Sequence, residues 1–150
     1  MEVFFININF IDMLNQYLAN INILITNLNI LYYNLINDDN NFRNTINNYI
    51  NTISNINKEI GEAIKERGGF ILIDNNKIKE ISTIKILANK NYSSKEEKGI
   101  INNMFNIINN ITKQLGEYTL KNREYDIFSI VIEFNKFLNK NIWHLTMEKY

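Results

Sequence analysis

The sequence lacks cysteine and proline, and it contains little glycine, alanine or histidine. Its 150 residues include no Cys, no Pro, five Gly, three Ala and a single histidine, His144. Without cysteine the chain can form no disulfide bond and can offer no thiolate to a metal. One histidine excludes a metal site built on two histidines. With so few residues that interrupt helices, the sequence shows no linker that would separate two domains.

Hydrophobic residues make up 45% of the chain, which is enough for a core. We therefore expect a single helical domain over residues 1–150. No apolar run reaches the ~18 residues that a membrane-spanning helix needs, so no transmembrane anchor is expected. The first basic residue is Arg43. Because a secretory leader carries basic residues at its start, no such leader is expected.

Two residue types dominate the composition, with 30 Asn and 29 Ile. Both belong to A/T-rich codons, which indicates a very A/T-rich genome. We interpret the asparagines mainly as mutational drift, and their interleaving with apolar residues at helical spacing favours a packed fold over disorder. The net charge is zero and the lysines are spread over several segments, so no nucleic-acid partner is expected.

Apolar residues recur at spacings of three and four, which is typical of amphipathic helices. This pattern predicts helices at about 10–20, 25–36, 46–64, 78–88, 99–115 and 127–142. Arg67-Gly68-Gly69 is expected to end the third of these, because glycine readily adopts left-handed backbone angles. Residues 70–74 are predicted to be extended, and a hairpin with 77–87 is the alternative to the helix at 78–88.

The last two predicted helices have the widest apolar faces, so we expect them to form the centre of the core. Ser94 and Glu97 have the spacing of a capping box at the start of the first one. Gly116 is expected to end that helix, Gly99 to allow a close helix approach, and Trp143 to close the core. Residues 119–124 would form the polar break between the two helices.

Groups that could perform catalysis are scarce. The paired carboxylates Asp38-Asp39 and Glu96-Glu97 lie at predicted helix termini, where their interaction with the helix dipole explains them. His144 lies beside Trp143 in an aromatic pair that is better explained by packing. We therefore predict no catalytic residue, no metal site, no cofactor and no enzyme activity.

The segments 93–118 and 125–143, with the break Gln114-Leu115-Gly116-Glu117-Tyr118, resemble the end of a Bcl-2-like domain of the poxviral type. Two segments nearer the N-terminus are compatible with this family, namely Asn15-Gln16-Tyr17-Leu18 and Leu31-Tyr32-Tyr33-Asn34-Leu35-Ile36. The resemblance implies an all-α fold, a single Bcl-2-like bundle of about seven helices around a buried central hairpin. Residues 99–115 and 127–142 would be the arms of that hairpin.

The same resemblance implies a non-enzymatic viral protein in the host cell cytoplasm. It would bind host signalling adaptors or kinases and dampen innate NF-κB signalling, with homodimer formation as a further expectation. The alternative is an anti-apoptotic homologue that holds pro-apoptotic helices in a groove. In groove-binding cellular members an Asn-Trp-Gly-Arg motif begins the central helix, and here Lys98 and Ile100 flank the matching Gly99, which favours the signalling branch. An unrelated small helical protein from an A/T-rich genome is the third possibility.

Five positions follow from this interpretation as candidates for contact with a partner. They are Lys98, Gly99, Ile100, Met104 and Trp143.

Overall fold

A computed structural model describes residues 5, 8–36 and 39–147 of the chain. Four long helices and one short helix account for most of these residues. They are α1 (Phe10–Asn34), α2 (Asn40–Glu66), α3 (Asn75–Ile81), α4 (Ser94–Lys121) and α5 (Tyr125–Met147). Among the described residues, no helix is long and apolar enough to cross a membrane.

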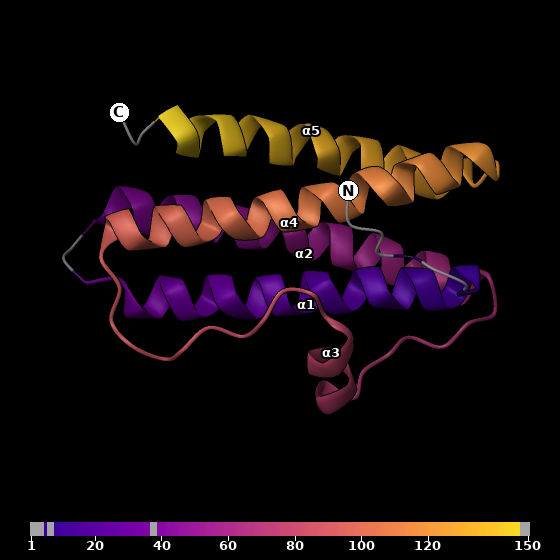
Figure 1. Cartoon of the computed structure of the whole chain (residues 1–150), viewed down its shortest axis with the longest axis horizontal. Helices are drawn as coiled ribbons and strands as arrows, with labels where there is room; N and C mark the ends of the chain where they lie inside the picture. The colour runs from indigo at the N-terminus through magenta and orange to yellow at the C-terminus, as the bar shows by residue number, and fades with distance from the viewer. Residues whose placement is uncertain (1–4, 6–7, 37–38, 148–150) are drawn as a thin grey trace.

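The four long helices form one bundle from two antiparallel pairs (Figure 1). Short connections join α1 to α2 and α4 to α5, so that each pair is a helical hairpin. Between the pairs, residues 67–93 travel back along the whole length of the bundle, on the side of α1 (Figure 1). We call this segment the crossover. Because of it, α2 and α4 run in the same direction, and the short helix α3 lies within it.

The core lies between the four helices and receives apolar residues from all of them. Tyr17 of α1, Phe105 of α4 and Phe134 of α5 are the largest side chains that are fully buried. The Tyr17 hydroxyl lies 2.8 Å from Thr112 Oγ1, and the Thr112 hydroxyl donates to the carbonyl oxygen of Ile108. Polar atoms in this part of the interior are thus satisfied by neutral partners.

Several predicted helix ends are wrong, because helices run through them. The separate helices predicted at 10–20 and 25–36 are one continuous α1. Gly116 does not end a helix but lies inside α4, which continues to Lys121. The capping box exists one residue earlier than predicted, since Ser93 and Glu96 form it. The helix expected at 78–88 is only the seven-residue α3, and residues 82–92 continue without helix.

Two glycine assignments have clear outcomes. The predicted stop after the third helix is confirmed, because α2 ends at Glu66 and Gly68 has a φ of 74°. The proposed close approach at Gly99 is wrong, since a Cβ built there would meet no atom within 4 Å. Trp143 does not close the core either, because 60% of its surface is exposed.

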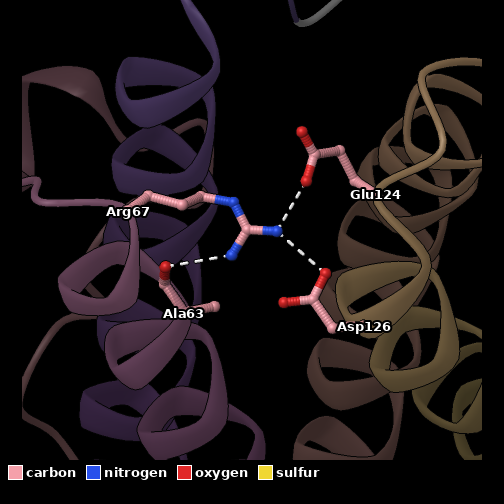
Figure 2. A network of polar contacts seen from close by, with 4 residues as sticks. All are labelled: Ala63, Arg67, Glu124 and Asp126. Atoms are coloured by element: carbon pink, nitrogen blue, oxygen red, sulfur yellow. Dashed lines mark hydrogen bonds and ion pairs between the residues drawn. The ribbon is translucent and has the colours of Figure 1, made fainter.

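At one end of the bundle, a salt-bridge cluster ties the two hairpins together. Arg67 follows the last turn of α2, and its Nη2 donates to Glu124 Oε2 at 2.6 Å and to Asp126 Oδ1 at 2.8 Å (Figure 2). Its Nη1 donates to the carbonyl oxygen of Ala63, and its guanidinium lies over the Phe10 ring. The pKa of the Asp126 carboxyl is lowered, chiefly by its hydrogen bond with Arg67. The cluster therefore fixes the start of α5 against the end of α2.

Candidate self-association surface

Asparagines of α1 hold the crossover against the bundle. Asn20 is fully buried, and its Oδ1 accepts from the Ser82 hydroxyl and from the backbone N–H groups of Thr83 and Ile84, the last at 3.1 Å. Asn27 is also fully buried, and its side chain both donates to and accepts from the crossover backbone. Its Nδ2 donates to Lys85 O at 2.8 Å and its Oδ1 accepts from Leu87 N at 3.0 Å.

The same pattern extends towards both ends of α1. Asn15 donates to Phe70 O and accepts from Leu72 N, each at 2.9 Å. Near the other end Asn34 donates to Asn89 Oδ1 at 2.6 Å. Since Asn20, Asn27 and Asn34 follow each other at seven residues, they share one face of the helix. The crossover, in which α3 is the one helix, is thereby fixed along α1.

The fixed crossover presents large apolar side chains to solvent. Phe70 is 84% exposed, Ile73 82% and Ile86 40%. Ile73 and Ile86 border a groove of about 520 Å³ between α1 and the crossover, whose floor includes Leu18 and Ile23. A second groove of about 550 Å³ continues it over α2 and shares Leu18, Asn57 and Ile71 with the first. We call the two grooves with Phe70, Ile73 and Ile86 the crossover face.

Charges of both signs border the crossover face along α2. Lys58, Glu62, Lys65 and Glu66 line the second groove. The Lys65 ammonium also lies 5.1 Å from the centre of the Phe70 ring. These side chains alternate in sign along one helix, so an antiparallel copy of α2 related by a two-fold axis can place lysines opposite glutamates.

The five positions predicted for partner contact do not form one surface. Lys98, Gly99 and Ile100 lie in the first turns of α4, and Lys98 Nζ lies over the Phe42 ring at 5.2 Å. Met104 is buried, and its sulfur accepts from Asn27 Nδ2. Trp143 is exposed near the end of α5, where it contacts His144. None of the five lines either groove of the crossover face, and a role in binding for any of them stays a prediction.

Sequence reasoning missed the crossover face. Its signal in the sequence is the regular spacing of seven between Asn20, Asn27 and Asn34, which the interpretation of asparagine as codon drift overlooks. The path of the crossover decides which asparagines bind its backbone. The spacing of the asparagines alone does not predict that path.

The residues of one chain can be compared with the ligand set of known di-iron bundles. Bundles that hold two iron ions use a Glu from each of two helices and a Glu-x-x-His pair from each of the others, all facing inward. Here the buried carboxyl is Glu97, near the bundle end, whereas His144 is exposed and follows Asn141 by three residues. The described residues contain no group of three or more His, Cys, Asp or Glu that could hold a metal. The described residues of one chain therefore do not supply that ligand set.

Comparison with known proteins identifies the architecture. No protein-family model and no curated protein matches the sequence. Solved structures do match: antigen TpF1 from Treponema pallidum superposes with a TM-score of 0.87 at 14% identity, over 92% of this chain and 89% of that one. Dps from Staphylococcus aureus matches with a TM-score of 0.84 at 19% identity, over 92% and 93%. Dps from Listeria innocua soaked with zinc matches with 0.86 at 14% identity, over 93% and 94%.

The chain has the Dps-type fold. Two helical hairpins joined by one long crossover are the ferritin-like arrangement of a four-helix bundle. At these identities the comparison establishes the fold alone.

The Dps-type fold corrects the family and fold predictions. The Bcl-2-like assignment and the seven-helix bundle around a central hairpin are wrong, because the described residues form five helices and none of the four long ones is enclosed by the rest. The predicted arms, 99–115 and 127–142, are the inner parts of α4 and α5. They pair as expected, but they form one side of a bundle whose other side is α1 and α2.

The functional predictions tied to that family are also wrong. Antagonism of host NF-κB signalling, capture of pro-apoptotic helices and binding of host adaptors lose their basis with the Bcl-2-like fold. The prediction of no enzyme activity is contradicted too, because it drew on the Bcl-2-like assignment, which the Dps-type fold replaces.

Proposed function

We propose that this chain is a subunit of a homo-oligomeric Dps-type assembly, and that two copies meet through the crossover face. The Dps-like fold is one that suggests self-assembly into an oligomeric shell. The observation that carries the proposal is the exposure of Phe70 and Ile73 on a segment that side-chain amides hold in place. Exposed apolar side chains on a rigid surface favour association, because little ordering entropy is lost on binding.

A second copy is the occupant that the charges favour. A two-fold contact brings the same surface of each subunit together, so the surface must complement itself. The lysines and glutamates that border the second groove on α2 meet this requirement when two copies pair antiparallel. The apolar side chains of the crossover would lie in the middle of such a contact and the charges around it, as in other protein interfaces.

The oligomeric state tests the proposal. Native mass spectrometry and light scattering should give the wild type a mass of at least twice 17.8 kDa. The double variant Phe70→Asp/Ile73→Asp should be monomeric, because it removes the apolar side chains and places carboxylates from both copies inside the contact, where their desolvation is costly. Tyr33→Asp is the matched control, since Tyr33 is 77% exposed and lies outside the crossover face. A monomeric wild type at micromolar concentration, or a double variant that assembles like the wild type, would contradict the proposal.

Iron chemistry is best examined in the assembled protein. Dps and ferritin-like proteins store iron and protect DNA. Since the described residues of one chain do not supply a metal-binding cluster, ligands for iron would have to include residues from two copies. The rate of ferrous iron oxidation, measured in the wild type and in the monomeric variant, distinguishes a site within one chain from a site shared by two copies. Oxidation that requires assembly supports a shared site, and equal rates in both proteins contradict it.

A further inference from the structure

One buried carboxyl has no partner in the described part of the structure. Glu97 lies in the first turn of α4 with none of its surface exposed, and neither Oε1 nor Oε2 has a hydrogen-bond partner. Its neighbour Glu96 is exposed and belongs to the capping box. A buried carboxylate without hydrogen bonds is far less stable than the neutral acid, so this environment favours the protonated form.

The opposite charge that acts on Glu97 belongs to Arg43 of α2, and this guanidinium is already engaged. Its Nε donates to Tyr32 O at 3.2 Å and its Nη2 to Leu35 O at 3.1 Å. Arg43 therefore binds the free carbonyl groups at the end of α1, which have no partner within that helix.

Other charged groups lie at the same end of the bundle. Glu96 adds a like charge next to Glu97. Asp39, Lys98 and His144, from the start of α2, from α4 and from α5, line a cavity of about 150 Å³ there. No hydrogen bond joins any of these groups to the Glu97 carboxyl.

We propose that Glu97 is a proton-controlled latch for the junction of α1, α2 and α4. As a neutral acid it leaves Arg43 on the α1 carbonyls, and the junction stays closed. When the carboxyl releases its proton to solvent, the carboxylate attracts the Arg43 guanidinium away from Tyr32 and Leu35. The end of α1 then loses its partners, and the junction opens to water.

The opening should be visible where the crossover rejoins α1. There Ile36 N donates to Tyr92 O at 2.9 Å and Tyr92 N donates to Asn34 O at 3.0 Å. Both amides lie between the Arg43 contacts and the start of α4, so they report on this junction. Burial raises the pKa of Glu97 to about 8, which places the transition near the upper end of the physiological range.

Amide hydrogen exchange between pH 6 and 9.5 tests the latch. Protection of Ile36 and Tyr92, corrected for the intrinsic rise of exchange with pH, should fall about tenfold or more in the wild type as Glu97 ionises. Glu97→Gln keeps the shape and cannot ionise, so its protection should stay constant. Glu117→Gln, at an exposed position of the same helix, is the control and should behave like the wild type.

A direct titration supplies the second measurement. In wild-type protein labelled at the glutamate carboxyls, NMR should give a midpoint near 8 for the signal that disappears in Glu97→Gln. A midpoint below 6 would overturn the proposal, as would a pH-dependent loss of protection that persists in Glu97→Gln. Constant protection in the wild type while Glu97 titrates would also overturn it.

Discussion

At the scale of residues, a few asparagines have a structural role that their abundance conceals. Asn20 joins three donors of the crossover to one side-chain oxygen, and its Nδ2 donates to Gln16 O. Asn110, on α4, is exposed to solvent. The same residue type is thus buried and hydrogen-bonded at one position and exposed at another, according to what lies opposite.

Asn20→Ala should destabilise the protein strongly. The substitution leaves the backbone N–H groups of Thr83 and Ile84 without their acceptor, whereas the Ser82 hydroxyl keeps the Ile84 carbonyl oxygen. The loss should cost about 2–4 kcal/mol of unfolding free energy. Urea unfolding measures the difference. Asn110→Ala is the control, and its effect should stay within about 0.5 kcal/mol. Equal effects of the two variants would mean that the contacts of Asn20 contribute little.

Glu97 should make the global stability depend on pH. Its pKa is about 8 in the folded chain and 4.5 ordinarily, so between these values the folded state binds more protons than the unfolded state. Stability from this group is therefore complete below about pH 4.5 and is lost as the pH rises towards 8, by about 1.4 kcal/mol per pH unit at most. Urea unfolding at pH 5, 7 and 9 should show this loss in the wild type. The dependence of the unfolding free energy on pH should largely disappear in Glu97→Gln. An unchanged dependence would mean that other groups cause it.

At the scale of elements, helices continue wherever tertiary contacts support them. Residues 20–25 of α1 contain no breaker, and asparagine disfavours a helix only slightly. The buried contacts of Asn20 with the crossover compensate for that weak preference. In α4, Gly116 is followed by buried Thr119, so packing carries the helix past the glycine.

Gly116→Ala should stabilise the protein. A Cβ built at Gly116 would meet Val131 Cγ2 at 3.6 Å, an ordinary contact, and alanine favours the interior of a helix over glycine by about 0.5–1 kcal/mol. Thermal unfolding should therefore shift upwards. Gly69→Ala gives the contrast, because a Cβ there would lie 2.9 Å from Ile11 Cγ2 and should destabilise. A lower melting temperature for Gly116→Ala would show that α4 and α5 pack too tightly there for a methyl group.

At the scale of the whole molecule, the bundle presents an apolar face that one copy of the chain leaves uncovered. Phe70, Ile73 and Ile86 come from the crossover, while the charges beside them come from α2. If this surface joins two copies, stability and assembly are linked, because association favours the folded state.

The melting temperature of the wild type should therefore rise with protein concentration, by about 2–4 °C for each tenfold increase. The Phe70→Asp/Ile73→Asp variant should melt at a temperature independent of concentration. Differential scanning calorimetry over a hundredfold range distinguishes the two. A wild-type melting temperature that does not change with concentration would argue against linked assembly.

Helical periodicity predicted the positions of α2 and of the inner parts of α4 and α5, because apolar spacing reflects a buried face whatever covers it. The ends of helices were harder to predict. Gly68 ended α2 as expected because its backbone is left-handed, whereas Gly116 has no such geometry and did not end α4. The order of the helices also gave the wrong resemblance to Bcl-2-like proteins. An amphipathic helix, a glycine and a second amphipathic helix occur in many bundles and do not identify one fold.

The sequence by itself determined that this protein is helical and lacks disulfides, because these properties depend on residue types and on spacing along one element. Only the tertiary structure decided that the hairpins pair side by side, that the crossover follows α1, and that Phe70 and Ile73 remain outside. These features depend on contacts between residues far apart in the sequence, such as Asn15 with Phe70, 55 positions apart, and Tyr17 with Thr112, 95 positions apart. Periodicity shows that a helix face is buried, but it does not show which other helix covers it. The pairing of these faces is what gives this chain the Dps-type fold.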